Sequence, residues 1–211
     1  MKNLITYFCF ACFISSYHTV TAQEPVDVLE EVPYNYKKRS PIYDYSEHQL
    51  NNTDTIPDFE TKTNKLKITG TIFQNDGITP AKDVILYISQ TDENGSYVLK
   101  TDNHEKRYVY HRGWIKTNED GHYTFYTFVP GTFLRSNELK HIHPVIKEPN
   151  KPEYNIDTFL FDDDPLLTKS CRKRLKRRGI DTILKLEKKD GMYVATKDII
   201  LEPDQNILAY K

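Results

Sequence analysis

Cysteine is scarce in this chain, and its few copies are unevenly placed. Cys9 and Cys12 lie within the first 22 residues, and Cys171 is the only other one. If the N-terminal segment is removed, a single cysteine remains. No intramolecular disulfide can then form, so the fold has to be held by packing and hydrogen bonds.

The chain also lacks an excess of charge of one sign. It has 29 Lys and Arg against 30 Asp and Glu, a net charge of -1 with neutral histidine. Loss of residues 1–22, which contain Lys2 and no acid, would make the net charge -2. A near-neutral chain does not indicate a nucleic-acid partner, because nucleic-acid binding depends on a basic surface.

No membrane span is expected, because the only long apolar run is the short one at the N-terminus. Residues 1–22 have one lysine, an apolar centre, and small residues at Val20 and Ala22. This layout predicts a secretory signal peptide that is cut after Ala22, and hence export to the periplasm or the cell exterior. An alternative is a lipid anchor at Cys12, which follows an alanine.

The remaining 189 residues favour one domain with an N-terminal extension. Residues 23–65 are polar and show no sustained periodicity, so we expect an extended arm. The domain itself is expected at residues 66–211. Four tyrosines suggest that part of the arm packs against the domain, and four prolines interrupt it: Tyr34, Tyr36, Tyr43, Tyr45, Pro25, Pro33, Pro41 and Pro57.

Short alternating segments separated by turn residues dominate the domain. Residues 65–77 alternate apolar and polar side chains and end in Asn-Asp-Gly, which predicts a strand and a hairpin-type return. Further β-rich runs cover residues 84–90, 108–117, 122–129, 182–186 and 193–201. The pattern predicts an all-β fold, an antiparallel β-sandwich of the prealbumin-like kind. A short basic helix is expected near the C-terminus, ending at Gly179.

Two histidines one residue apart stand in an apolar run, HIHPVI. Because side chains alternate along a strand, His141 and His143 point to the same face and Ile142 to the other. Two neutral imidazoles on one face suit iron, zinc, copper or nickel. The spacing therefore predicts half of a metal site.

Three segments together resemble the intradiol ring-cleavage dioxygenases, and the likeness is closest to the secreted bacterial branch of that family. They are RGWIKTNEDGHYTFYTFVPGTF (112–133), HIHPVIKEP (141–149) and FLFDDDPLL (159–167). The resemblance covers roughly residues 66–201. It implies a non-haem ferric iron enzyme that uses O2 to open a small aromatic diol, a catechol, between its two hydroxyls.

The family holds Fe(III) with two tyrosinates and two histidines, a set of hard anionic oxygens and imidazoles that suits the ferric ion. By resemblance, the histidines match His141 and His143, and the first tyrosine matches Tyr97. At the place of the second tyrosine this chain has Phe133, which has no oxygen to donate. A replacement ligand such as Tyr154 is an open alternative.

The resemblance also implies a cis,cis-muconate-type diacid as the product. Trp114, Tyr126 and Phe133 are candidates for the substrate pocket, although each suits a sandwich core as well. Two other hypotheses stay open: a non-catalytic sandwich module descended from the family, and a zinc or copper site on the same three residues. The basic helix is expected to be a solvated face, and the sequence leaves an oligomer possible.

Overall fold

The computed structural model describes residues 33–46, 50–133 and 137–203. The signal peptide expected at residues 1–22 and the alternative anchor at Cys12 lie outside the described residues. The chain divides into two units, Met1–Tyr34 and Asn35–Lys211. Only the second unit is described below, because nearly all of the first falls outside the described ranges.

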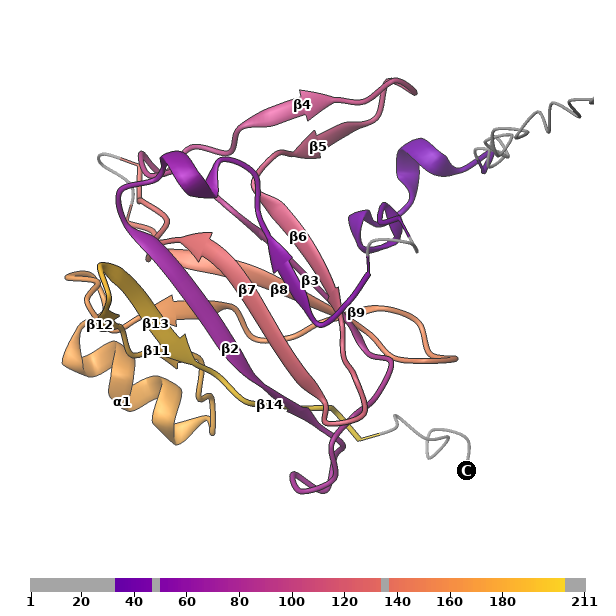
Figure 1. Ribbon diagram of the computed structural model, residues 1–211. Helices are drawn as coiled ribbons and strands as arrows, with labels where there is room; N and C mark the ends of the chain where they lie inside the picture. Colours follow the sequence, from indigo (N-terminus) through magenta and orange to yellow (C-terminus); the bar gives the residue numbers. More distant parts are fainter. Residues whose placement is uncertain (1–32, 47–49, 134–136, 204–211) are drawn as a thin grey trace, which may run out of the picture. The chain divides into compact units, whose positions relative to one another are not determined.

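Two mixed β-sheets form the second unit, as the sequence predicted for a sandwich (Figure 1). The first sheet has the order β1-β7-β2-β13-β12, with β14 also on β2, and the second has the order β11-β10-β8-β3-β6, with β9 on β8. A hairpin of β4 and β5 stands apart from both. The bounds are β1 Thr53–Thr55, β2 Lys65–Phe73, β3 Ile85–Gln90, β4 Leu99–Thr101, β5 Arg107–Val109, β6 Arg112–Lys116, β7 His122–Phe128, β8 His141–Lys147, β9 Tyr154–Asn155, β10 Phe159–Phe161, β11 Ile183–Leu184, β12 Glu187–Lys189, β13 Met192–Thr196 and β14 Ile199–Ile200.

The sheets are mixed rather than purely antiparallel. Four pairings are parallel, namely β1 with β7, β13 and β14 with β2, and β10 with β11. In each pair the two strands are joined through long stretches of chain, so no tight turn imposes an antiparallel direction. The sandwich was therefore predicted correctly, and the direction of its added strands was not.

The core lies between the two sheets and follows from the alternation along the strands. In β2 every second residue is buried, beginning with Leu66 and Ile68. The opposing sheet contributes Leu86 and Ile88 of β3 and Ile142 of β8, all of which are buried. Burial of such side chains stabilises the fold by about 1.5–3 kcal/mol each.

The turn after β2 does not make a hairpin between consecutive strands. Gln74 N donates to Thr79 O (2.7 Å), and Phe73 makes an isolated bridge with Pro80. The chain then crosses to the second sheet, where β3 pairs with β6 and β8. The expected hairpin-type return is thus limited to a local reversal.

The described part of the arm packs on the domain. It forms the 3-10 helices η1 (Tyr36–Lys38), η2 (Pro41–Tyr43) and η4 (Phe59–Thr61) and the strand β1. Ile42 is fully buried against Ile85 and Tyr87 on the outer face of the second sheet. The domain boundary at residue 65 remains a prediction.

A buried ionic cluster also holds the arm. The Asp44 carboxylate lies 2.7 Å from Lys106 Nζ, and both side chains are almost completely buried. Arg39 and Arg112 contact the same carboxylate at 3.3 and 3.5 Å. Lys106 and Arg112 are 62 and 68 residues away from Asp44 along the chain, so these contacts fix the arm beside β6.

The short helix α1 (Lys169–Arg177) confirms the helix that was expected near the C-terminus. The Thr168 side chain caps its N-terminus by accepting from Cys171 N at 3.2 Å. Gly179 ends it with φ +71°, a conformation that glycine adopts without strain. No helix among the described residues is long and apolar enough to cross a membrane.

Candidate metal site

The histidine pair lies on β8, in the middle of the second sheet between β3 and β10. Ile142 is fully buried toward the core, so His141 and His143 project from the outer face, as the period-two alternation predicted. Their ring centroids are 4.5 Å apart. Pairing on both edges fixes the backbone that presents the two imidazoles (Figure 1).

A backbone contact orients the first imidazole. His141 Nδ1 lies 2.6 Å from Leu139 O, and because a carbonyl oxygen can only accept, Nδ1 carries the proton. The lone pair is then on Nε2, which lies next to the Tyr97 hydroxyl. Metal-ligating histidines are commonly oriented by such a contact of the other ring nitrogen.

Tyr97 reaches the histidines from the loop that follows β3. Asp92 shapes this loop, since its Oδ1 accepts from Asn94 N (2.9 Å) and Ser96 N (2.8 Å). Gly95 takes φ +82° at the turn, a value that side chains disfavour. In this loop conformation the Tyr97 hydroxyl lies 3.2 Å from His141 Nε2.

The structure therefore brings the three expected donors together. The Tyr97 and His143 rings are nearly parallel, with centroids 6.5 Å apart. His143 is exposed and the Tyr97 residue is 41% exposed, so solvent and small molecules reach this place. Their role as metal ligands remains a prediction.

The surroundings shift the pKa values of two of these groups. Burial raises the pKa of Tyr97, and the charge of Glu138 and the neighbouring Tyr87 add to the rise. Burial and the adjacent His141 lower the pKa of His143, which Glu138 opposes. The neutral imidazole favoured at His143 is the form that binds metals.

Phe133 lies beside the Tyr97 loop, although its ring is not part of a packed core. Its backbone passes so close to Gly95 that a Cβ added at Gly95 would be 2.1 Å from Phe133 N. The residue is 61% exposed. The Phe133 corner is thus adjacent to the Tyr97 loop, and the Phe133 side chain offers no donor atom.

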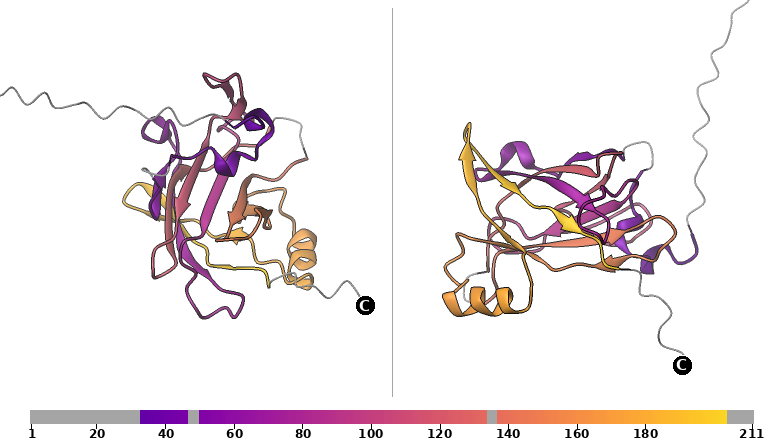
Figure 2. Two further views of the ribbon diagram at one scale, coloured as in Figure 1. Left: turned by 90° about the vertical axis from the view of Figure 1, so that its right-hand side faces the viewer. Right: turned by 90° about the horizontal axis from the view of Figure 1, so that it is seen from below.

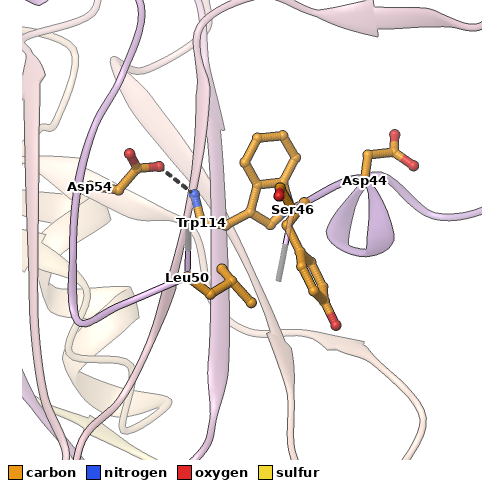
Figure 3. A pocket seen from close by; sticks show the side chains of 6 residues that line it. Asp44, Ser46, Leu50, Asp54 and Trp114 are labelled. Atoms are coloured by element: carbon orange, nitrogen blue, oxygen red, sulfur yellow. Dashed lines mark hydrogen bonds between the residues drawn. The ribbon is translucent and has the colours of Figure 1, made fainter. Parts of the chain in front are cut away.

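The other two pocket candidates do not join the donors. Tyr126 is on β7 of the first sheet, where its ring packs against Phe59 with centroids 5.7 Å apart. Trp114 is on β6, and its Nε1 donates to Pro41 O of the arm at 3.1 Å. It lines a separate cavity of about 100 Å³ beside Asp54, whose carboxylate accepts from Trp114 N (Figure 3).

Tyr154 does not replace the missing tyrosine either. On β9 it pairs with Ile146, and it packs against the core on the face opposite to the histidines. Its hydroxyl donates to Glu148 Oε1 at 2.9 Å. Burial and this carboxylate raise its pKa, which keeps the phenol protonated.

Sequence inspection missed the side chains that flank the donors on the neighbouring strands. Ser89 of β3 is the register partner of both His143 and Arg112, so these three lie in one row across the outer face. Tyr87, two residues earlier on the same face, is 4% exposed. Strand register alone would have located this row, and local sequence patterns do not encode it.

A metal ion at this place would need a third donor besides the two histidines. Within the described ranges no group of three or more His, Cys, Asp or Glu could hold one, so Tyr97 has to supply the third donor. One phenol oxygen and two imidazoles, one of them with its Nδ1 proton fixed, fit an iron site with open coordination positions. The residues present therefore fit a three-donor site.

Comparisons with known proteins define the fold. No protein-family model and no curated protein matches the chain in sequence. Among solved structures it is similar to the dioxygenase domain of a dioxygenase and carbohydrate-binding fusion from Streptomyces sp. SirexAA-E, with a TM-score of 0.54 and 20% identity. The match covers 77% of this chain and 99% of that one. The chain thus has the fold of a ring-cleaving dioxygenase domain.

Two further structures agree. An intradiol ring-cleavage dioxygenase from Tetranychus urticae matches with a TM-score of 0.52 and 18% identity, over 78% of this chain and 92% of that chain. Catechol 1,2-dioxygenase from Pseudomonas arvilla C-1 matches with a TM-score of 0.56 and 14% identity, over 74% of this chain. The match spans only 58% of the latter enzyme. The resemblance seen in the sequence is confirmed at the level of the intradiol dioxygenase fold.

Proposed function

We propose that the protein is a non-haem ferric iron dioxygenase that cleaves a catechol-type ring between its two hydroxyls. The observation that carries the proposal is the convergence of Tyr97 on His141, with 3.2 Å between Oη and Nε2, beside His143. Support comes from the fold, which is shared with enzymes whose names state this chemistry. We further propose that the protein is exported and that its site opens to solvent.

Tyr97 Oη, His141 Nε2 and a ring nitrogen of His143 would hold the ion. When bound, ferric iron would supply a Lewis-acid centre that polarises and orients the diol. The overall reaction adds both atoms of O2 to the substrate and breaks the bond between the hydroxyl-bearing carbons. A muconate-type diacid results, and no other reductant or oxidant is consumed.

The residues of the chain have separate tasks in this scheme. Leu139 O accepts the Nδ1 proton of His141, so the imidazole keeps its lone pair on Nε2, where the ion would bind. Tyr97 Oη is the only phenol oxygen among the three donors, so it would be the single anionic ligand that the chain supplies. With Phe133 in place of a second phenol, the protons of both substrate hydroxyls have to pass to solvent.

Turnover of catechol by the iron-loaded protein tests the proposal. We expect a diacid that carries both atoms of ¹⁸O2, measured by mass spectrometry. His143→Ala should abolish the product, whereas His104→Ala should not, because His104 is exposed and its ring packs against Tyr36 of η1. An iron-loaded protein that gives no diacid from catechol or its ring-substituted analogues would overturn the proposed activity.

A second candidate function is favoured by Phe133. Loss of one anionic ligand suits a sandwich that binds a ligand without converting it. In that case the metal or an aromatic diol would still bind, with the Kd raised by His143→Ala, and no diacid would form. Binding and turnover measured on the same preparation separate the two functions.

A further inference from the structure

Helix α1 concentrates positive charge in a protein that is otherwise acidic. Residues 169–178 contain seven basic residues and no acidic one. Because the net charge of the whole chain is -1, the remainder carries -8. Figures 1 and 2 show α1 at the periphery of the described unit, beside the sheets and not between them.

One side of α1 faces the body of the protein. Arg172 binds there, because its guanidinium contacts Asp162 Oδ1 and donates to Asp162 O (2.7 Å) and Leu167 O (3.1 Å). Cys171 and Leu175, which fall on the same side at 100° per residue, are half-buried. These three residues account for the attachment of the helix.

The other basic residues are free of such partners. Within the part of the chain that the structure describes, no ion pair engages six exposed side chains: Lys169, Lys173, Arg174, Lys176, Arg177 and Arg178. Four of them, at positions i, i+4, i+7 and i+8, fall on one stripe along the helix, and we call these the basic face: Lys169, Lys173, Lys176 and Arg177. Arg174 and Arg178 extend the charge around the helix.

The clustered positive charge of the basic face destabilises helix α1. Lys173 has a like charge three or four residues away at Lys169, Lys176 and Arg177, and such pairs destabilise a helix. No acidic residue in the helix offsets the repulsion. A bound anion would remove it, so the surface is suited to a ligand of opposite charge.

We propose that the basic face binds a linear acidic polysaccharide, one that carries carboxylate or sulfate groups. The six cations cover roughly 200° of the helix circumference. A flexible chain can follow that curvature, whereas a flat membrane meets only one strip of it. The outward side also has no apolar residue to insert among lipids. Residues 166–185 contain no aromatic ring on which a nucleotide base could stack.

The test measures binding of heparin and of polygalacturonate to the full mature chain by calorimetry at 0.15 M salt. We expect binding whose affinity falls with salt, with a log–log slope of about -3 for the four cations of the basic face. The variant Lys173→Glu, Lys176→Glu, Arg177→Glu should weaken it at least tenfold. Its melting temperature should not fall, because the substitutions relieve repulsion within the helix.

A matched control changes the same amount of charge elsewhere. Lys38→Glu, Lys185→Glu, Lys188→Glu alters three exposed lysines outside α1 and should leave the affinity within twofold. Equal losses of affinity in both variants, or no binding of either polysaccharide by the wild-type protein, would overturn the proposal. So would tighter binding to a DNA oligonucleotide or to phosphatidylglycerol vesicles. Iron content and turnover do not enter these outcomes, so the proposal stands or falls apart from the proposed activity.

Discussion

Gly95 is the position where a single methyl group should disturb the candidate site most. It takes φ +82°, and a Cβ there would lie 2.1 Å from Phe133 N and 2.2 Å from the carbonyl carbon of Thr132. Ordinary contact begins at 3.4 Å, and both neighbours are backbone atoms. Gly95→Ala therefore has to push the Tyr97 loop and the Phe133 corner apart by more than 1 Å.

The decrease in the free energy of unfolding expected for Gly95→Ala has two parts. A positive φ costs alanine about 1–2 kcal/mol. Separating the loops also breaks the bonds from Gly131 N to Asp92 O (2.9 Å) and from Thr91 Oγ1 to Gly131 O (3.1 Å), at about 1 kcal/mol each. The total is about 3–4 kcal/mol.

Gly191 provides the matched control. It has the same φ of +82°, and nothing lies within 4 Å of an added Cβ. Gly191→Ala should therefore lower the free energy of unfolding only by the cost of the positive φ, about 1–2 kcal/mol. Urea unfolding of both variants measures the difference, which we expect to be about 2 kcal/mol. Equal losses would refute the close packing of the two loops.

Three further predictions concern the corner, a buried histidine and the ionic cluster. Phe133→Tyr should strengthen iron retention against a chelator and deepen the visible colour; if neither changes, position 133 is out of reach of the metal. Burial lowers the pKa of His111, so the unfolded chain gains a proton first as pH falls below about 6.5, and stability is lost as the pH drops further. His111→Leu should flatten that decline in urea unfolding, and an unchanged slope would assign it to other groups. Asp44→Asn leaves Lys106 buried without its counter-charge and should lower the free energy of unfolding by about 3–5 kcal/mol; a loss below 1 kcal/mol would show that the cluster does not fix the arm.

The parts of the site that local geometry determines were predictable from sequence. The alternation of a strand places His141 and His143 on one face, and the Asp92 to Gly95 turn positions Tyr97 after β3. The helix near the C-terminus was equally accessible, because Gly179 marks its end. In each case the information lies within a few residues of the feature.

Features that depend on distant contacts were not predictable. The Asn-Asp-Gly turn fixes a reversal, but it does not determine that β3 enters the opposite sheet. The burial of Ile42 depends on Tyr87 and Ile85, which are far away in sequence. The row that brings Arg112 opposite Ser89 requires strand register, and register is set by the packing of whole faces.

The most direct test of the central claim is iron stoichiometry measured together with the visible spectrum. Purified mature protein would be loaded with iron, oxidised in air and desalted, and Tyr97→Phe would be compared with Tyr193→Phe, a tyrosine on the first sheet. We predict one iron per chain and a tyrosinate-to-iron band that is lost only in Tyr97→Phe. A colourless, iron-free wild-type protein, or a band that survives in Tyr97→Phe, would contradict the assignment of Tyr97, His141 and His143 as the metal site.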